Sequence, residues 1–175
     1  MEHRAFTFNF KAFTAELCPL LEKVLADGQV ASLVGFIVEN RRALKDPYEG
    51  KPIGQEWEAL LDNRDVHEYG DFALTKYYDP VADIGIGDEW EAAQAISLER
   101  LGTDLAVLGR TVGSADNLFD PGRVGSYFQS EEDVATHLGQ IEALLVGGED
   151  SPVIERLRGM LATATKLGTG LYITF

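Results

Sequence analysis

Cysteine is almost absent from this chain, with Cys18 alone among 175 residues. A single thiol cannot form a disulfide within the chain, so the small folds that depend on disulfides are excluded. Such sparing use of cysteine is typical of proteins kept in a reducing compartment. Because Cys18 precedes a proline on an apolar helix face, we expect a small buried side chain there rather than a nucleophile.

Long hydrophobic runs are also missing. The longest, Val30 to Val38, falls far short of the roughly 20 apolar residues that cross a bilayer. The first residues, Met1 to Arg4, lack the cationic start and apolar core of a signal peptide. We therefore expect a soluble cytoplasmic protein that does not bind membranes.

Positive charge is scarce, with 15 Lys and Arg against 29 Asp and Glu, a net charge of -14 and a pI near 4.5. Nucleic acids and anionic lipids bind to clustered cations, so both are excluded as partners. The acids are unevenly distributed, because Asp46 to Glu91 contains thirteen carboxylates and only three cations. This segment therefore contributes ten of the fourteen net negative charges.

Catalytic motifs are missing as well. The glycines at 85 and 87 lack the third glycine of a dinucleotide-binding fingerprint, since Trp90 stands where close packing is required. His67 and Glu68 begin an H-E-x-x-H pattern that fails because residue 71 is aspartate. No catalytic residue is assigned, and the sequence favours a protein that is not an enzyme.

Length and a 45% apolar content predict one globular domain over residues 1–175. Phenylalanines alternate with polar residues over 6–10, and apolar residues alternate over 171–175, the period of strands with one buried face. Because such short strands are unstable alone, we expect the N-terminal and C-terminal strands to pair.

Most of the remaining chain has helical spacing. The predicted helices are 11–27 with a break near Pro19, 30–44, 55–63, 88–108, 130–147 and 151–168. A further strand is expected at 124–128, and the pattern over 65–87 fits neither a helix nor a strand. The predicted fold class is α+β, mostly helical with a small sheet.

Carboxylates and glycines between Asp79 and Glu89 suggest a loop for a hard cation such as calcium or magnesium. The spacing is not that of an EF-hand, because Val81 and Ile84 stand at ligand positions. A divalent-metal-binding protein or metal-assisted hydrolase is therefore an alternative, and it requires at least three side chains to converge. Its candidate ligands are His67, Asp79, Asp83 and Asp88.

The acidic segment is also rich in large aromatic side chains. The leading hypothesis is a non-enzymatic binding or regulatory module whose segment 46–91 contacts a basic protein, with charge complementarity speeding the encounter. A small-ligand pocket lined by the rings is the other alternative. No cofactor is predicted beyond the divalent cation of the metal alternative. The candidate binding residues are Tyr48, Trp57, Tyr69, Tyr77, Tyr78 and Trp90.

Overall fold

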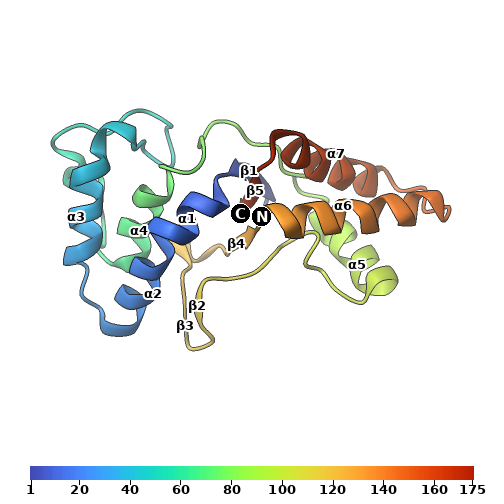
Figure 1. Cartoon of the computed structure of the whole chain (residues 1–175), viewed down its shortest axis with the longest axis horizontal. Helices are drawn as coiled ribbons and strands as arrows, with labels where there is room; N and C mark the ends of the chain where they lie inside the picture. Colours follow the sequence, from blue (N-terminus) through green and yellow to red (C-terminus); the bar gives the residue numbers. More distant parts are fainter. The chain divides into compact units, whose positions relative to one another are not determined.

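The computed structural model describes all 175 residues and has an α+β fold with 51% helix (Figure 1). The α-helices are α1 (Phe10–Glu16), α2 (Cys18–Asp27), α3 (Ala31–Asn40), α4 (Val66–Leu74), α5 (Trp90–Leu101), α6 (Glu131–Val146) and α7 (Pro152–Leu167). The strands are β1 (Arg4–Phe8), β2 (Gly113–Ser114), β3 (Asn117–Leu118), β4 (Ser126–Gln129) and β5 (Gly170–Thr174). Short 3-10 helices are η1 (Arg41–Ala43), η2 (Trp57–Leu60) and η3 (Pro121–Arg123). None of the helices combines the length and apolar character needed to span a bilayer.

The chain packs as two compact units. Unit 1 contains residues 1–10, 83–110 and 127–175, and unit 2 contains residues 11–82 and 111–126. The chain passes from one unit to the other four times, so neither unit is a continuous segment.

Unit 1 is built on the antiparallel sheet β1-β5-β4. Strands β1 and β5 pair from Arg4 opposite Thr174 to Phe8 opposite Gly170, which confirms the predicted pairing of the two terminal strands. The strand predicted over 6–10 begins earlier and ends at Phe8, because Phe10 already starts α1.

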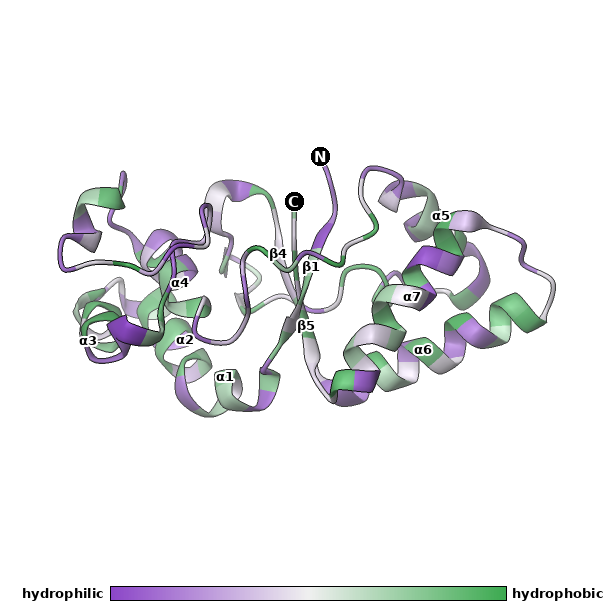
Figure 2. Ribbon diagram, turned by 90° about the horizontal axis from the view of Figure 1, so that it is seen from above, coloured by the Kyte–Doolittle hydropathy of each residue, from purple (hydrophilic) through white to green (hydrophobic).

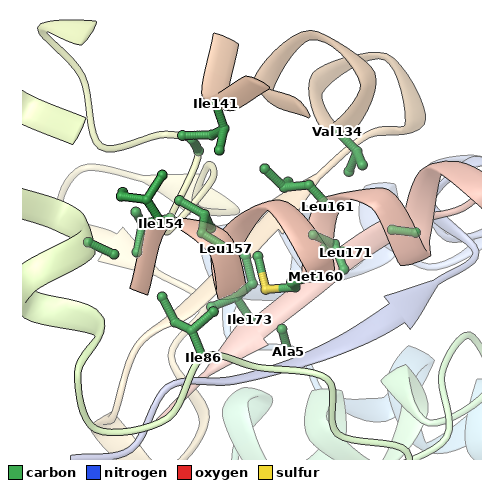
Figure 3. Packing of buried hydrophobic residues seen from close by; sticks show 14 of the residues in the cluster. Ala5, Ile86, Val134, Ile141, Ile154, Leu157, Met160, Leu161, Leu171 and Ile173 are labelled. Carbon is green, nitrogen blue, oxygen red and sulfur yellow. The ribbon is translucent and has the colours of Figure 1, made fainter. Parts of the chain in front are cut away.

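The core of unit 1 lies where α6 and α7 pack against each other and against β5 (Figure 3). Leu157 and Leu161 of α7 are fully buried there beside Met160, and Ile173 of β5 completes the cluster. Hydrophobic and hydrophilic residues alternate along both helices, as expected where one helix face is buried (Figure 2).

The ends of the unit 1 helices follow local sequence signals. Ser130 and Asp133 form the capping box that starts α6, as the Ser-acid pattern predicts. Gly102 adopts a left-handed conformation and ends α5 at Leu101, so the helix predicted over 88–108 is shorter than expected. Ser151 precedes α7, but its side chain makes no capping hydrogen bond.

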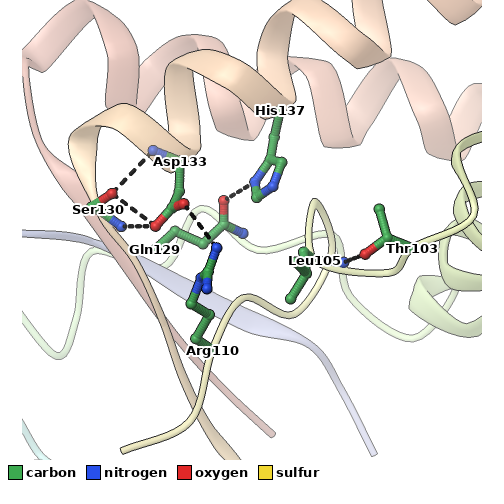
Figure 4. A network of polar contacts seen from close by, with 7 residues as sticks. All are labelled: Thr103, Leu105, Arg110, Gln129, Ser130, Asp133 and His137. Atoms are coloured by element: carbon green, nitrogen blue, oxygen red, sulfur yellow. Dashed lines mark hydrogen bonds and ion pairs between the residues drawn. The ribbon is translucent and has the colours of Figure 1, made fainter.

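A polar network fills the space beneath α6 (Figure 4). Gln129 is fully buried, donates to the carbonyl of Ala106 at 3.3 Å and lies 2.8 Å from Nδ1 of His137. Arg110 lies 3.8 Å from Asp133, beside the capping box. These contacts join β4 and residues 106–110 to the first half of α6.

Unit 2 is mainly helical, with α4 in contact with both α2 and α3. The predicted break near Pro19 is present, because α1 ends at Glu16 and α2 begins at Cys18 with the proline in its first turn. The segment without a clear pattern forms α4, and the helix predicted over 55–63 is only the short η2.

Candidate binding site

A cavity of about 750 Å³ lies in unit 2 between the start of α4 and segment 115–123. Its lining is acidic, because six carboxylates face one arginine, Arg123. His67, Tyr48 and two asparagines complete the polar lining. The six carboxylates are those of Asp62, Asp65, Glu68, Asp71, Asp116 and Asp120.

Two of these acids build the first wall of the cavity. Asp65 caps α4 by accepting hydrogen bonds from the backbone N–H groups of His67 and Glu68, both at 3.0 Å. The Glu68 carboxylate reaches back and accepts the N–H groups of residues 62–64 at 2.7, 2.8 and 2.8 Å. A carboxylate held by several backbone amides fixes the loop that it closes. Asp65 and Glu68 are therefore structural members of the lining.

Segment 115–123 forms the second wall and is attached to α4. The backbone N–H of Asp120 donates to Nδ1 of His67 at 3.1 Å, and the imidazole stacks on Phe119 with ring centroids 6.1 Å apart. Phe119 is fully buried and lies against Gly70 of α4. The Asp120 carboxylate accepts the N–H of Gly125 at 2.7 Å, which closes the loop between these two residues.

Asp71 differs from the other acids, because it lines the cavity yet is only 8% exposed. Burial raises the pKa of Asp71 from its ordinary 3.8 to about 7, and the nearby Asp46 and Glu68 act in the same direction. A hydrogen bond with Tyr48 opposes this rise without cancelling it. Tyr48 is 74% exposed, so its ring is accessible from solvent.

The proposed metal ligands lie in different environments. His67 lines the cavity, Asp79 pairs with Lys45 at 2.9 Å, and Asp88 is exposed. Asp83 accepts the backbone N–H groups of Ala5 and Gly85 at 3.0 and 2.8 Å, and pairs with Arg4 at 3.2 Å. No group of three or more His, Cys, Asp or Glu side chains is placed to hold a metal ion. The convergence that the metal alternative requires is not met.

The six aromatic candidate residues also lie in different parts of the structure. Tyr48 lines the cavity. Trp57, Tyr69 and Tyr77 are 3%, 5% and 5% exposed and pack inside unit 2, with Trp57 and Tyr69 edge to face. Tyr78 is half-buried and is not part of the lining. Trp90 belongs to unit 1, where its ring lies 4.6 Å from that of Phe175. Of the six rings, the cavity includes Tyr48 alone.

Among the residues that line the cavity, the sequence patterns did not single out Asp62, Asp65, Asp71 or Asp116. Asp71 stands out only in the structure, where it is an acid in the consecutively buried run Tyr69–Leu74. No signal in the sequence marks Asp116. Comparisons with protein-family models, curated proteins and solved structures found no match.

Proposed function

We propose that this protein is a non-enzymatic binding module whose cavity in unit 2 receives a basic side chain of a partner protein. The observation that carries this proposal is Asp71, a carboxyl that is 8% exposed and lines a cavity of about 750 Å³. The charged groups that act on its pKa are the carboxylates of Asp46 and Glu68, and both raise it. A buried acid without a counter-charge is costly for a fold, and a cation in the cavity would supply that charge.

The rest of the lining supports a cationic occupant. Asp62 and Asp116 are exposed at the cavity, and their side chains accept none of the hydrogen bonds that hold the loops together. The ring of Tyr48 is accessible beside them, and an aromatic face attracts a guanidinium or ammonium group. A net charge of -14 would also speed the approach of a basic partner.

A small organic cation is a second candidate, favoured by the cavity volume. Pockets for small ligands measure roughly 300 to 1,000 Å³, although most are apolar. The strongly acidic lining fits a polyamine or an arginine-like amine better than a neutral ligand.

The test uses a fluorescent synthetic peptide in which Arg alternates with Gly-Ser, and a matched peptide with neutral citrulline in place of Arg. Anisotropy is measured with the wild type, with Asp62→Asn/Asp116→Asn, and with Glu132→Gln/Asp150→Asn, which removes the same charge from exposed acids of unit 1. We expect only the Arg peptide to bind and the cavity variant to weaken it about tenfold, about 1.4 kcal/mol.

Equal weakening by the two double variants would mean diffuse charge attraction and would contradict the proposal. Agmatine, the decarboxylated form of arginine, separates the two candidates. If agmatine binds more tightly than the peptide, the occupant is a small cation rather than a protein side chain.

A further inference from the structure

Asp71 is placed to couple binding to a proton. It lies on α4 between two buried residues, Gly70 and Phe72, and it is one of the residues that line the cavity. Interaction with the Tyr48 side chain lowers the pKa of Asp71 and so opposes the effect of burial. Asp71 is 8% exposed, lines a cavity and has no cationic partner, so its surroundings favour the neutral form of the carboxyl over the ionised one.

The charged and titratable groups around Asp71 come from four stretches of unit 2 and are mostly acidic. Asp46 and Glu68 act on it most strongly. The others are Tyr48 from the turn after Asp46, Asp62 from the loop before α4, Asp65 and His67 from the start of α4, and Asp116, Asp120 and Arg123 from segment 115–123. Ionisation of Asp71 therefore adds a further negative charge to a site that is already negative.

We propose that a cation entering the cavity displaces the proton of Asp71, so that the protein binds its basic partner with release of a proton. This inference rests on the proposed function and adds its regulation by pH. The O–H bond of the neutral acid breaks, the proton passes to a base in solution, and the carboxylate that remains pairs with the incoming cation. The partner then provides the positive charge that balances the Asp71 carboxylate.

Two consequences follow for binding. Affinity for the Arg peptide rises with pH through neutrality, by about tenfold between pH 6 and pH 8, and then levels off as Asp71 becomes ionised in the empty cavity. The Tyr48 hydroxyl stabilises the ionised acid, since its hydrogen bond lowers the pKa of Asp71. Tyr48→Phe is therefore expected to move the rise in affinity to higher pH.

The experiment is titration calorimetry of the Arg peptide at pH 6.5 in phosphate and in Tris, whose different ionisation enthalpies report the protons released. The wild type is expected to release a proton, and Asp71→Asn, which has nearly the same shape, to release none. Glu132→Gln/Asp150→Asn, which changes only exposed acids of unit 1, serves as a control that keeps the release. Unchanged release from Asp71→Asn would assign the proton to another group and overturn the inference.

The carboxyl carbon of Asp71 is also titrated by NMR without peptide. A midpoint near neutrality supports the inference, and a midpoint near that of an ordinary aspartate overturns it even if the peptide binds. If the peptide does not bind at any pH although Asp71 titrates with a midpoint near neutrality, both the proposed function and the coupling of binding to proton release are contradicted. The two failures are thereby distinguished.

Discussion

The imidazole of His67 accepts a hydrogen bond from the backbone N–H of Asp120 at 3.1 Å, across 53 positions of sequence. This contact joins the two walls of the cavity, because His67 opens α4 and Asp120 precedes η3. The neutral ring must then carry its proton on Nε2. The cavity is thus a product of tertiary packing between two segments of unit 2 and is not confined to one acidic loop.

The packing of the two walls can be tested at Gly70. A Cβ atom at this position would collide with the ring of Phe119 and approach Leu21 Cδ2 to 2.9 Å. Because Phe119 is fully buried and cannot move aside, we expect Gly70→Ala to destabilise unit 2 by about 1 to 3 kcal/mol. The measurement is urea unfolding followed by tryptophan fluorescence, with Trp57 as the probe in unit 2.

Gly35→Ala is the matched control, since Gly35 also lies in a helix of unit 2 and an added Cβ would have nothing within 4 Å. Alanine is the better helix former, so this variant should be up to about 1 kcal/mol more stable. Equal destabilisation by both variants would rule out the Phe119 contact as the cause.

Local signals explain which parts of the fold could be predicted. The alternation over 171–175 and the break at Pro19 are each decided by neighbouring residues, and each was confirmed. The helix α4 was not predicted, because Tyr69 to Leu74 are all buried and the sequence therefore has no polar face to reveal a period.

The loop before α4 gives a second prediction, at Glu68. Its carboxylate accepts three backbone N–H groups, whereas a glutamine side chain offers one acceptor oxygen and no charge. We expect Glu68→Gln to destabilise the protein by about 1 to 3 kcal/mol and to speed hydrogen exchange at residues 62–64. Glu58→Gln, an exposed change nearby, should stay within about 0.5 kcal/mol of the wild type. Unchanged exchange at 62–64 would show that the carboxylate does not fix the loop.

The cavity itself was beyond the reach of sequence patterns. The acids near the start of α4 and those of segment 115–123 are about 50 residues apart in the sequence, and no spacing rule predicts that they lie in one cavity. The aromatic residues were poor indicators of the cavity for a physical reason. Trp57, Tyr69 and Tyr77 are buried, where their rings contribute more to packing than they would at a surface.

Cys18 is expected to react slowly. Its side chain is half-buried, and burial with the nearby Glu22 raises the pKa of the thiol from 9.0 to about 11. Since the thiolate is the reactive form, alkylation by iodoacetamide at pH 8 should be roughly 100-fold slower than for an ordinary thiol. The same protein unfolded in urea is the control and should react at the ordinary rate. A folded protein that reacts as fast as the unfolded one would contradict the assigned environment.

His3 is expected to make the stability of the protein depend on pH. It is 1% exposed, with Nε2 at 2.9 Å from the carbonyl of Val107 and Nδ1 accepting the N–H of Ile86 at 3.4 Å. This arrangement needs the neutral ring, and burial lowers the pKa of His3 below its ordinary 6.5. Between the lowered pKa and 6.5, the unfolded chain binds more protons than the folded one, so stability rises with pH.

The stabilisation from neutral His3 is therefore complete above about pH 6.5 and is lost as the pH falls toward the lowered folded-state value. The measurement is the difference in unfolding free energy between the wild type and His3→Gln across this range, because the difference removes slopes from other groups, including Asp71. That difference should shrink as the pH falls. Val153→Ala, a buried change without a titratable group, should give a constant difference. A His3→Gln difference that is equally constant would mean that the imidazole binds protons equally in the folded and unfolded states, and the pH dependence would then belong to other residues.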